Sequence, residues 1–332
     1  DPVNGGMWYQ IKAEPDEEGH GVPWDEASRV KSQYHTVYAL LGVAAATVAN
    51  RPGAHELLET MLQEQKDYWI DDYGLVWDQY DEAFTEPAPV HALGTLIHTI
   101  EAYMAAAEAT TEPEWLDRAE KMTAFAYKVA SKNNWRIPEY YDEEWQPSLE
   151  AGKLCNDGRR YHEGYVTGHS MQLARFTLQV RAGLRSMGWD VPDYLLEMGT
   201  ELFERARVDG WRRTGGAPGF STGVNDQGDP VPGEDEHQQW VVCEGVCAAV
   251  AVRRAMLDDG HRLDEVEHFE HCYRSFVDYI HDYLITQPGR WIRRLGPNNE
   301  SVQPAKSSRW DVYHAIQAML AIRVPLWPPT AP

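Results

Sequence analysis

The sequence predicts an all-α protein in which an inner ring of helices is wrapped by an outer ring, with short β-hairpins in the loops at one end. Three observations support this toroid. Helical periodicity fills most of the chain, while strand-like stretches are few and short. The helices come in pairs whose first member is apolar or small on all sides, as in VYALLGVAAATVA, whereas the second has a polar face. A histidine recurs near the start of each apolar helix.

The first half of the chain contains two predicted helix pairs. Residues 1–24 are rich in Gly and Pro and include the strand-like NGGMWYQI. The sequence Asn50-Arg51-Pro52-Gly53 ends the first apolar helix, and Glu112-Pro113 begins the fourth helix. A second strand-like stretch, YGLVW, lies between the two pairs. The predicted helices are 25–50, 55–69, 87–109 and 113–132.

The second half repeats this pattern after a long loop at 135–158. The predicted helices are 167–185, 192–208, 235–257, 264–285 and 307–323. Residues 210–232 are too rich in Gly, Pro, Asp and Asn for a core element, and GRWIRRLGPNNE is hairpin-like. No linker divides the chain, so residues 1–332 are predicted to form a single domain. Because the chain begins at Asp1 without a methionine, some N-terminal residues are expected to be missing.

The charge of the chain argues against two classes of partner. There are 52 Asp and Glu residues against 30 Lys and Arg, which gives a formal charge of −22. Nucleic acids and anionic membranes bind basic surfaces, so neither is expected as a partner. Neither a long apolar run nor a signal-like start is present, so a cytoplasmic location is expected. The acidic surface fits a high-salt cytoplasm, although ordinary acidic cytosolic proteins have a similar one.

The chain lacks the common motifs for metals and nucleotide cofactors. Its four cysteines do not have zinc-ligand spacing and are predicted to be free thiols. There is no Gly-rich phosphate loop, no G-x-S-x-G elbow and no dinucleotide fingerprint. The sequence therefore predicts chemistry that depends on side chains alone, with no cofactor and no metal.

One histidine falls within the first turns of each predicted inner helix. The successive spacings are 63, 71, 68 and 77 residues, as expected for one helix pair with its loops, and the histidines are His35, His98, His169, His237 and His314. Side chains at the same end of a helical ring meet, so these histidines are predicted to line one pocket. The alternative is that several of them are buried histidines that bridge neighbouring helices.

The stretch Gly233–Val250 is the most informative of these helices. Acidic residues in its first turn suit a helix N-terminus. If the helix begins near residue 235, then His237, Trp240 and Glu244 share one stripe at i, i+3 and i+7. A basic ring, an aromatic face and a carboxylate would meet there. The alternative is a capped, half-buried helix without a functional role.

Histidines and a carboxylate around one cavity favour general acid–base chemistry. The unperturbed pKa of histidine, about 6.5, suits proton transfer near neutral pH. Loops at the same end of the predicted ring are rich in Trp and Tyr, whose flat faces pack against sugar rings. Abstraction of a proton next to a sugar carbonyl is therefore a candidate reaction. A toroidal glycoside hydrolase or lyase and a non-catalytic sugar-binding protein are the alternatives; a hydrolase needs two flanking carboxyl groups.

Five stretches in succession resemble the motifs of one superfamily. IHTIEAYMAAAEATTEPEWLDRAEKM is similar to an M-H-x-x-E-A helix and the helix after it, EYYDEEWQP to an E-x-x-D-x-x-W-x-P loop, and VTGHSMQLAR to a P-G-H-x-x-E-W segment. GGAPGFSTGVNDQGDPVP with WVVCEGVCAA resembles a glycine-rich loop and a W-x-x-x-E-A helix, and SSRWDVYHAIQAML resembles a closing Y-H helix. The superfamily is that of N-acylglucosamine 2-epimerase, with cellobiose 2-epimerases and mannose and sulfoquinovose isomerases.

The resemblance covers nearly the whole chain and implies an (α/α)6 barrel that interconverts sugars at C1 and C2 through an enediol, without a metal. The motifs are most similar to those of mannose isomerases, which implies conversion of mannose to fructose. A 2-epimerase acting on an N-acylhexosamine or a disaccharide is the alternative within the superfamily. The implied partner is a small sugar, and the protein is expected to be a monomer or a homodimer.

The resemblance also implies roles for individual residues. The implied catalytic residues are His314, His237, His169 and Glu244. The implied sugar-binding residues are His35, Tyr38, His98, Glu101, Gln172, Gln239, Trp240 and Trp310. The chain departs from the family pattern at three positions, with His35 for an arginine, Gln172 for a glutamate and Gln239 where isomerases tend to have a histidine. Loss of the guanidinium is expected to weaken hydroxyl or oxyanion binding, and Gln removes a proton acceptor.

Overall fold

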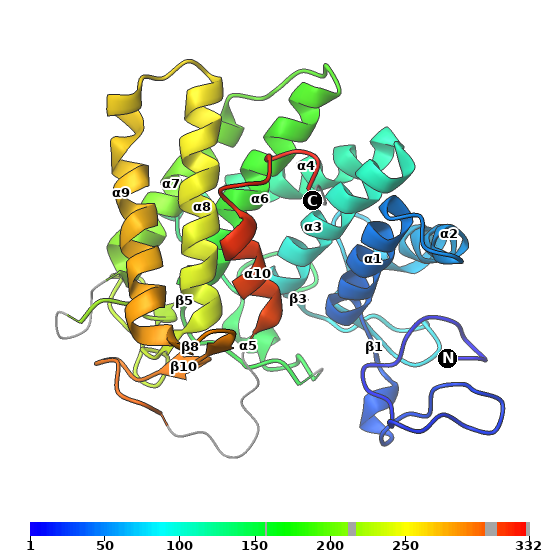
Figure 1. Ribbon diagram of the computed structural model, residues 1–332. Helices are drawn as coiled ribbons and strands as arrows, with labels where there is room; N and C mark the ends of the chain where they lie inside the picture. Colours follow the sequence, from blue (N-terminus) through cyan, green and yellow to red (C-terminus); the bar gives the residue numbers. More distant parts are fainter. Residues whose placement is uncertain (157, 212–216, 303–310, 330–332) are drawn as a thin grey trace. The chain divides into compact units, whose positions relative to one another are not determined.

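The computed structural model describes residues 1–156, 158–211, 217–302 and 311–329 (Figure 1). Helices dominate these residues and the strands are only two or three residues long, so the predicted helical class is confirmed. The chain divides into two compact units: Asp1–Thr123 with Pro138–Tyr161, and Ala124–Ile137 with His162–Pro332. The single domain over residues 1–332 stays a prediction. No described helix is both long and apolar enough to cross a membrane.

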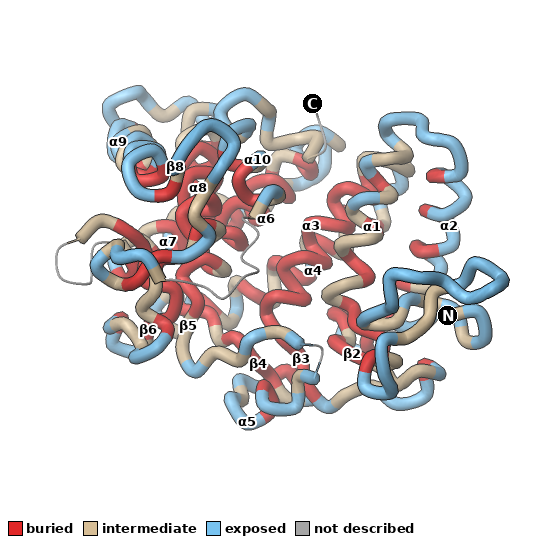
Figure 2. The backbone as a smooth tube through the Cα atoms, turned by 60° about the horizontal axis from the view of Figure 1, so that its bottom comes forward, coloured by how far each residue is buried: buried red, intermediate tan, exposed pale blue. Residues whose placement is uncertain are grey.

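In the first unit, α1 (Gln33–Val48) packs against α2 (Ala54–Glu64) and α3 (Leu93–Thr110). The side chains of α3 are mostly small or apolar, and the helix is buried along nearly its whole length (Figure 2). In contrast, α2 buries only one face and continues into a π-helical turn at Gln65–Trp69. The predicted alternation of apolar and one-sided helices is therefore present. Helix α4 (Pro113–Ala130) runs from the first unit into the second.

In the second unit, α8 (Gln239–Asp258) contacts four other helices of that unit (Figure 1). These neighbours are α6 (Thr167–Ser186), α7 (Tyr194–Gly210), α9 (Leu263–Tyr279) and α10 (Val312–Leu320). Helices α8 and α6 are buried on nearly all sides, whereas α7 and α9 each expose a polar face. The remaining short helical segments are α5 (Leu149–Gly152), a 3-10 turn at Ala27–Arg29 and a π-helical turn at Ile280–Leu284.

A two-residue strand precedes each of the four helices α1, α3, α6 and α8. These strands are β1 (Lys31–Ser32), β3 (His91–Ala92), β5 (Tyr165–Val166) and β7 (His237–Gln238). Each pairs antiparallel with a strand from a distant loop, respectively β2 (Gln79–Tyr80), β4 (Tyr140–Tyr141), β6 (Gly223–Val224) and β10 (Arg294–Leu295). The strands thus join separate loops, and among the described strands only β8 (Ile285–Gln287) and β9 (Arg290–Trp291) form a local hairpin.

These strands explain why three predicted helix starts are wrong. The helices predicted from 25, 87 and 235 begin at 33, 93 and 239, because the residues before them are used in strand pairing. The first amide of each helix then donates to a carbonyl of the partner loop, as Gln239 N does to Arg293 O at 2.9 Å. None of these four helices has a side-chain N-cap. Pairing with the loop replaces the cap that a helix start requires.

Two further sequence predictions change in detail. GRWIRRLGPNNE is not one closed hairpin, because β9 pairs with β8 and β10 pairs with β7. Its last residues do turn back on themselves, since Gly296 N donates to Glu300 O at 2.9 Å and Leu295 forms an antiparallel bridge with Ser301. The helix predicted at 307–323 is present as α10 over Val312–Leu320, and residues 303–310 lie outside the described residues. The four cysteines are free thiols, as predicted.

The packing of α7 on α6 predicts the effect of one small substitution. A Cβ atom at Gly199 would lie 2.7 Å from Leu178 Cγ, so Gly199→Ala is expected to lower the free energy of unfolding by about 1–3 kcal/mol. Gly42→Ala on α1 is the matched control, because nothing lies within 4 Å of its Cβ position. That change is expected to raise stability by up to about 1 kcal/mol. Urea denaturation measures both, and equal effects would contradict the described packing.

Candidate active site

Eight side chains from α6, α8 and the start of α10 lie together in the second unit. We refer to them as the α8 cluster: His169, Gln172, Arg175, Gln239, Trp240, Glu244, Asp311 and His314. Six of them are candidates from the sequence, and Arg175 and Asp311 are additional. Direct contacts hold the α8 cluster together.

Glu244 is the fully buried centre of the α8 cluster. Arg175 binds both of its oxygens, with Nε 3.0 Å from Oε2 and Nη2 3.0 Å from Oε1. Gln172 Nε2 adds a longer contact to Oε1 at 3.5 Å. A buried carboxylate is costly unless it is paired and hydrogen-bonded, and the planar guanidinium meets both needs. The pair therefore keeps a negative charge inside the unit and joins α6 to α8.

His314 lies between two carboxylates. Its Nδ1 is 2.7 Å from Asp311 Oδ2, and its Nε2 is 3.6 Å from Glu244 Oε1. Nε2 is shielded from solvent and has no hydrogen-bond partner among the described residues. Burial would raise the pKa of Asp311, but the hydrogen bonds and charge of His314 outweigh it and lower this pKa. An ionised Asp311 can accept a hydrogen bond from Nδ1–H, and in that tautomer Nε2 is the atom that can accept a proton.

Trp240 contacts both histidines of the α8 cluster. Its ring centroid is 5.3 Å from that of His169 and 5.7 Å from that of His314. The indole Nε1 donates to Gln238 Oε1 at 2.8 Å, which holds the ring in place. Gly168 permits this position, because a Cβ there would lie 2.4 Å from Trp240 Cζ3. The structure thus brings His169, Trp240 and His314 together, as the sequence predicts.

Gln239 is fully buried, and its amide is engaged by the protein backbone. Its Nε2 donates to Asp311 O at 2.8 Å, and its Oε1 accepts from Asp311 N at 3.1 Å. These hydrogen bonds give Gln239 a structural role, and its sugar-binding role stays a prediction. The side chain joins the start of α8 to the start of α10.

His237 does not share a helical stripe with Glu244, and that part of the sequence prediction is wrong. The residue lies in β7, before the helix begins, because it pairs with Leu295. Its Nδ1 is 2.9 Å from Asn299 Oδ1, and Tyr279 also contacts it. Burial lowers its pKa, although the hydrogen bond with Asn299 opposes this effect. These contacts favour a neutral ring that packs outside the α8 cluster.

The candidate residues of the first unit form a second group, the α3 cluster: Tyr34, His35, Tyr38, His98, Glu101 and Arg159. His98 is buried and bridges two partners, with Nδ1 3.1 Å from Glu101 Oε2 and Nε2 2.8 Å from Tyr38 Oη. His35 is half-buried, and its Nδ1 lies 3.0 Å from Ser32 Oγ. Its ring packs edge-on against the ring of Tyr34. The structure brings the four predicted residues of this unit together.

Arg159 supplies a guanidinium to the α3 cluster from a loop. Its Cζ lies 4.9 Å from the ring centroid of Tyr34, and Nη1 donates to Thr95 Oγ1 at 2.7 Å. It also forms an ion pair with Asp78. The family pattern has an arginine where this chain has His35. Arg159 instead brings a guanidinium to the neighbouring residue, Tyr34, from 125 positions further along the chain.

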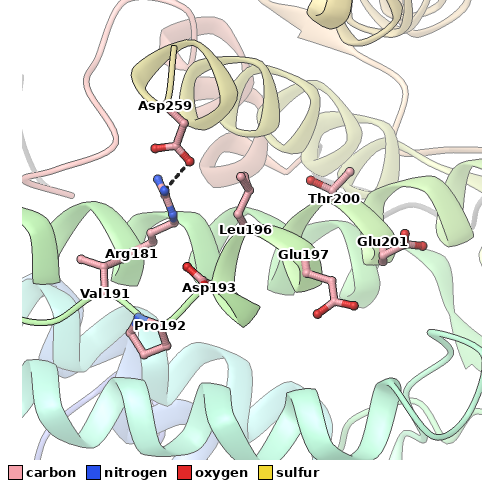
Figure 3. A pocket seen from close by; sticks show the side chains of 9 residues that line it. All are labelled: Arg181, Val191, Pro192, Asp193, Leu196, Glu197, Thr200, Glu201 and Asp259. Atoms are coloured by element: carbon pink, nitrogen blue, oxygen red, sulfur yellow. Dashed lines mark hydrogen bonds and ion pairs between the residues drawn. The ribbon is translucent and has the colours of Figure 1, made fainter. Parts of the chain in front are cut away.

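Three cavities described in the second unit are lined by residues other than these candidates. One, of about 360 Å³, lies at the far ends of α6 and α8 from His169 and Trp240. Figure 3 shows Arg181 bound to Asp259 at its edge, with Glu197 and Glu201 along α7. Among the described residues, no three His, Cys, Asp or Glu side chains are grouped as metal ligands. Trp310, a predicted sugar-binding residue, lies outside the described residues.

Two of the residues missed by the sequence reading had a recognisable signal. Arg175 is three residues after Gln172, so the two side chains are neighbours on the surface of α6. Asp311 is three residues before His314, which is the spacing of an N-cap residue that can also reach the side chain above it. Arg159 had no such signal, because it lies in an irregular loop.

The comparisons with known proteins agree with one another. A model of the family described as N-acylglucosamine 2-epimerase (GlcNAc 2-epimerase) matches residues 5–318. A D-mannose isomerase of Thermobifida fusca is 32% identical over 311 residues, covering 91% of this chain and 71% of that protein. A D-mannose isomerase of Pseudomonas cannabina pv. alisalensis is 30% identical, covering 92% of this chain and 72% of that protein.

Solved structures show the same fold. A D-mannose isomerase structure has a TM-score of 0.77 at 22% identity and covers 94% of this chain and 77% of its own. The cellobiose 2-epimerase of Spirochaeta thermophila has a TM-score of 0.74 at 17% identity and covers 97% and 75%. These likenesses confirm the predicted (α/α)6 fold class.

The pairing of Arg175 with Glu244 predicts a large stability effect. Arg175→Met leaves a fully buried carboxylate without its cation and is expected to lower the free energy of unfolding by about 3–5 kcal/mol. The double variant with Glu244→Gln should recover much of this loss, because no charge then remains buried. Lys121→Ala, which removes an exposed ion pair with Asp117, should cost no more than about 1 kcal/mol. Urea denaturation measures all three, and an additive double variant would contradict the pairing.

Proposed function

Because the chain belongs to the N-acylglucosamine 2-epimerase family, we propose that this isomerase or epimerase converts D-mannose to D-fructose through an enediolate. The two D-mannose isomerase relatives support this substrate. The observation that carries the proposal is the position of His314, whose Nδ1 is bound by Asp311 and whose Nε2 faces Glu244. A histidine held in this way has one ring nitrogen available for proton transfer.

The reaction moves one proton between adjacent carbons of the open-chain sugar. We propose that His314 Nε2 removes the proton from C2. The electrons of that C–H bond form a C1–C2 double bond, and the C1 carbonyl becomes an enediolate oxygen. The same nitrogen then returns the proton to C1, while the proton of the C2 hydroxyl moves to the oxygen on C1. The product is a ketose, and atoms and charge balance without an oxidant.

Glu244 and Arg175 have a supporting role in this proposal. Both oxygens of Glu244 are bound by Arg175, whereas His314 Nε2 has no hydrogen-bond partner among the described residues. When Nε2 carries a proton, the carboxylate 3.6 Å away stabilises the imidazolium. His169, which packs against Trp240 as His314 does, is the proposed group that moves protons between the sugar oxygens.

The α3 cluster is proposed to bind sugar hydroxyls. Tyr38, His98 and Glu101 form a chain of hydrogen bonds with donors and acceptors suited to hydroxyl groups. This chain has His35 where the family pattern has an arginine, and Arg159, over the ring of Tyr34, supplies a cation in its place. That the histidines of both units line one pocket stays a prediction.

A 2-epimerase is the second candidate, and one observation favours it. Epimerisation needs two acid–base groups, one for each face of the enediolate, and two histidines, His169 and His314, pack against the same side chain, Trp240. An N-acylhexosamine or a disaccharide would be its substrate. A catalytic role for His237 also stays a prediction. The products separate the candidates, because isomerisation of mannose yields fructose and epimerisation yields glucose.

Removal of His314 provides the most direct test of the proposed chemistry. In deuterated water, the wild-type protein should exchange the C2 hydrogen of mannose and form fructose, both followed by NMR. His314→Ala should reduce exchange by at least about 10²-fold, because a general base typically contributes 10²–10⁴-fold. Circular dichroism checks that the variant is folded.

His91→Gln is the matched control for this experiment. It removes a buried histidine whose Nδ1 binds Val76 O and which has no role in the proposed reaction. Wild-type exchange should be retained to within about threefold. Retained turnover in His314→Ala would remove His314 from the mechanism. Absence of exchange in the wild type with mannose, glucose, N-acetylmannosamine and cellobiose would contradict the isomerase and epimerase proposals together.

The acidic composition supports a further proposal, that the protein works in a cytoplasm of high salt. A formal charge of −22 produces self-repulsion, which salt screens. The screening length falls from about 10 Å at 0.1 M to about 3 Å at 1 M salt. Cytoplasmic location and a monomeric or homodimeric state stay predictions.

Salt should therefore stabilise this protein. Its melting temperature is expected to rise by several degrees between 0.1 M and 2 M potassium chloride. Differential scanning fluorimetry measures the shift, and sodium sulfate at matched ionic strength separates charge screening from general salting-out. A flat response to potassium chloride would contradict the proposal.

A further inference from the structure

The start of α10 differs from the starts of α1, α3, α6 and α8. Those four helices have no side-chain cap and bind a partner loop through their first amides. In α10, the side chain of Asp311 caps the helix, with Oδ1 accepting from His314 N at 3.1 Å. The other oxygen, Oδ2, binds His314 Nδ1 at 2.7 Å. One carboxylate therefore positions both the backbone and the ring of the same residue.

Gln239 in turn fixes the backbone of Asp311. Its amide oxygen accepts from Asp311 N, and its amide nitrogen donates to Asp311 O. Gln239 is the first residue of α8 and Glu244 is five residues further along the same helix. The helix that carries Glu244 thereby also sets the place of Asp311. The positions of both carboxylates next to the His314 ring, those of Glu244 and Asp311, therefore depend on α8.

We propose that Asp311 and Gln239 are positioning residues that hold His314 in the Nδ1–H tautomer, with Nε2 directed at Glu244. This inference rests on the proposed function for its catalytic consequence. Its structural part, the tautomer, stands without any substrate. In the other tautomer, the lone pair of Nδ1 would face the Asp311 carboxylate, which is unfavourable because two acceptors would meet.

The residue type at position 239 is part of this inference. An amide presents a donor and an acceptor side by side, which matches the N–H and C=O of one backbone residue. An imidazole has its two nitrogens on different edges of the ring and cannot bind both groups in this way. Glutamine at 239, a departure from the isomerase pattern, therefore has a positive role here. Where isomerases tend to have a histidine, Gln239 makes two hydrogen bonds to the backbone of Asp311.

The charged groups around His314 determine what removal of Asp311 should do. Asp311 and Glu244 both favour the imidazolium. Arg175 pairs with Glu244, Arg293 adds a positive charge that acts on Asp311, and His169 packs against Trp240. Removal of Asp311 therefore takes away both a charge next to the His314 ring and the group that binds its Nδ1.

Asp311→Asn is the principal test, because asparagine is also a good N-cap and α10 should be retained. We expect kcat to fall by about 10²- to 10⁴-fold, as for loss of a tautomer-fixing aspartate in a His–Asp pair, with little change in KM. The ¹⁵N NMR signals of His314, assigned with His314→Gln, should change from the Nδ1–H form to a mixture of tautomers. Gln239→Leu should shift the same signals and kcat in the same direction, by less.

Two controls separate positioning from stability. Gln65→Ala removes a buried amide that pairs with Gln33, and should lower stability while the His314 signals stay unchanged. Asp311→Ser keeps a cap but is too short to reach Nδ1, so it should behave like Asp311→Asn. The proposal is overturned if both Asp311 variants keep the wild-type tautomer, or keep kcat within about threefold. A tautomer change in a protein without sugar exchange would support the positioning and contradict the proposed function.

Discussion

The buried ion pair between Arg175 and Glu244 is the constraint on which the second unit depends. A carboxylate with no solvent exposure must be paired, and the arginine that pairs with it lies on the neighbouring helix. The register of α6 against α8 follows from this contact. The same carboxylate lies beside His314 Nε2 and is approached by Gln172. Packing and chemistry therefore share one group, and a change that relaxes the pair alters both.

The starts of the internal helices form the second organising feature. In α1, α3, α6 and α8, a two-residue strand binds a distant loop immediately before the helix begins. Loops are thereby tied to the helix ends where the candidate residues lie. Histidine occupies the third helical position in α1, α6 and α10, as His35, His169 and His314, whereas α8 has Val241 there. The tryptophan just before it, Trp240, contacts both histidines of the α8 cluster.

Periodicity predicted the helices, their alternation and most of the candidate residues, because apolar spacing within a helix is a local property. Strand pairs of two residues leave no local pattern, so the start of α8 was misplaced and His237 was assigned to the wrong face. The spacings of 68 and 77 residues on either side of His237 are uneven, which indicates that His237 does not occupy the same helical position as His169 and His314. Asp311 and Arg175 were readable from spacing, but Arg159 depends on a loop that returns to Tyr34. Its place is set by tertiary contacts alone.

In the proposed reaction, one shielded nitrogen, His314 Nε2, carries the proton between C2 and C1. Mannose labelled with deuterium at C2, converted by the wild-type protein in ordinary water and stopped early, tests this claim most directly. Because Nε2 is shielded from solvent, part of the label should appear at C1 of fructose, in one of its two positions. Complete loss of deuterium to water, even in the first turnover, would contradict transfer by a single shielded base.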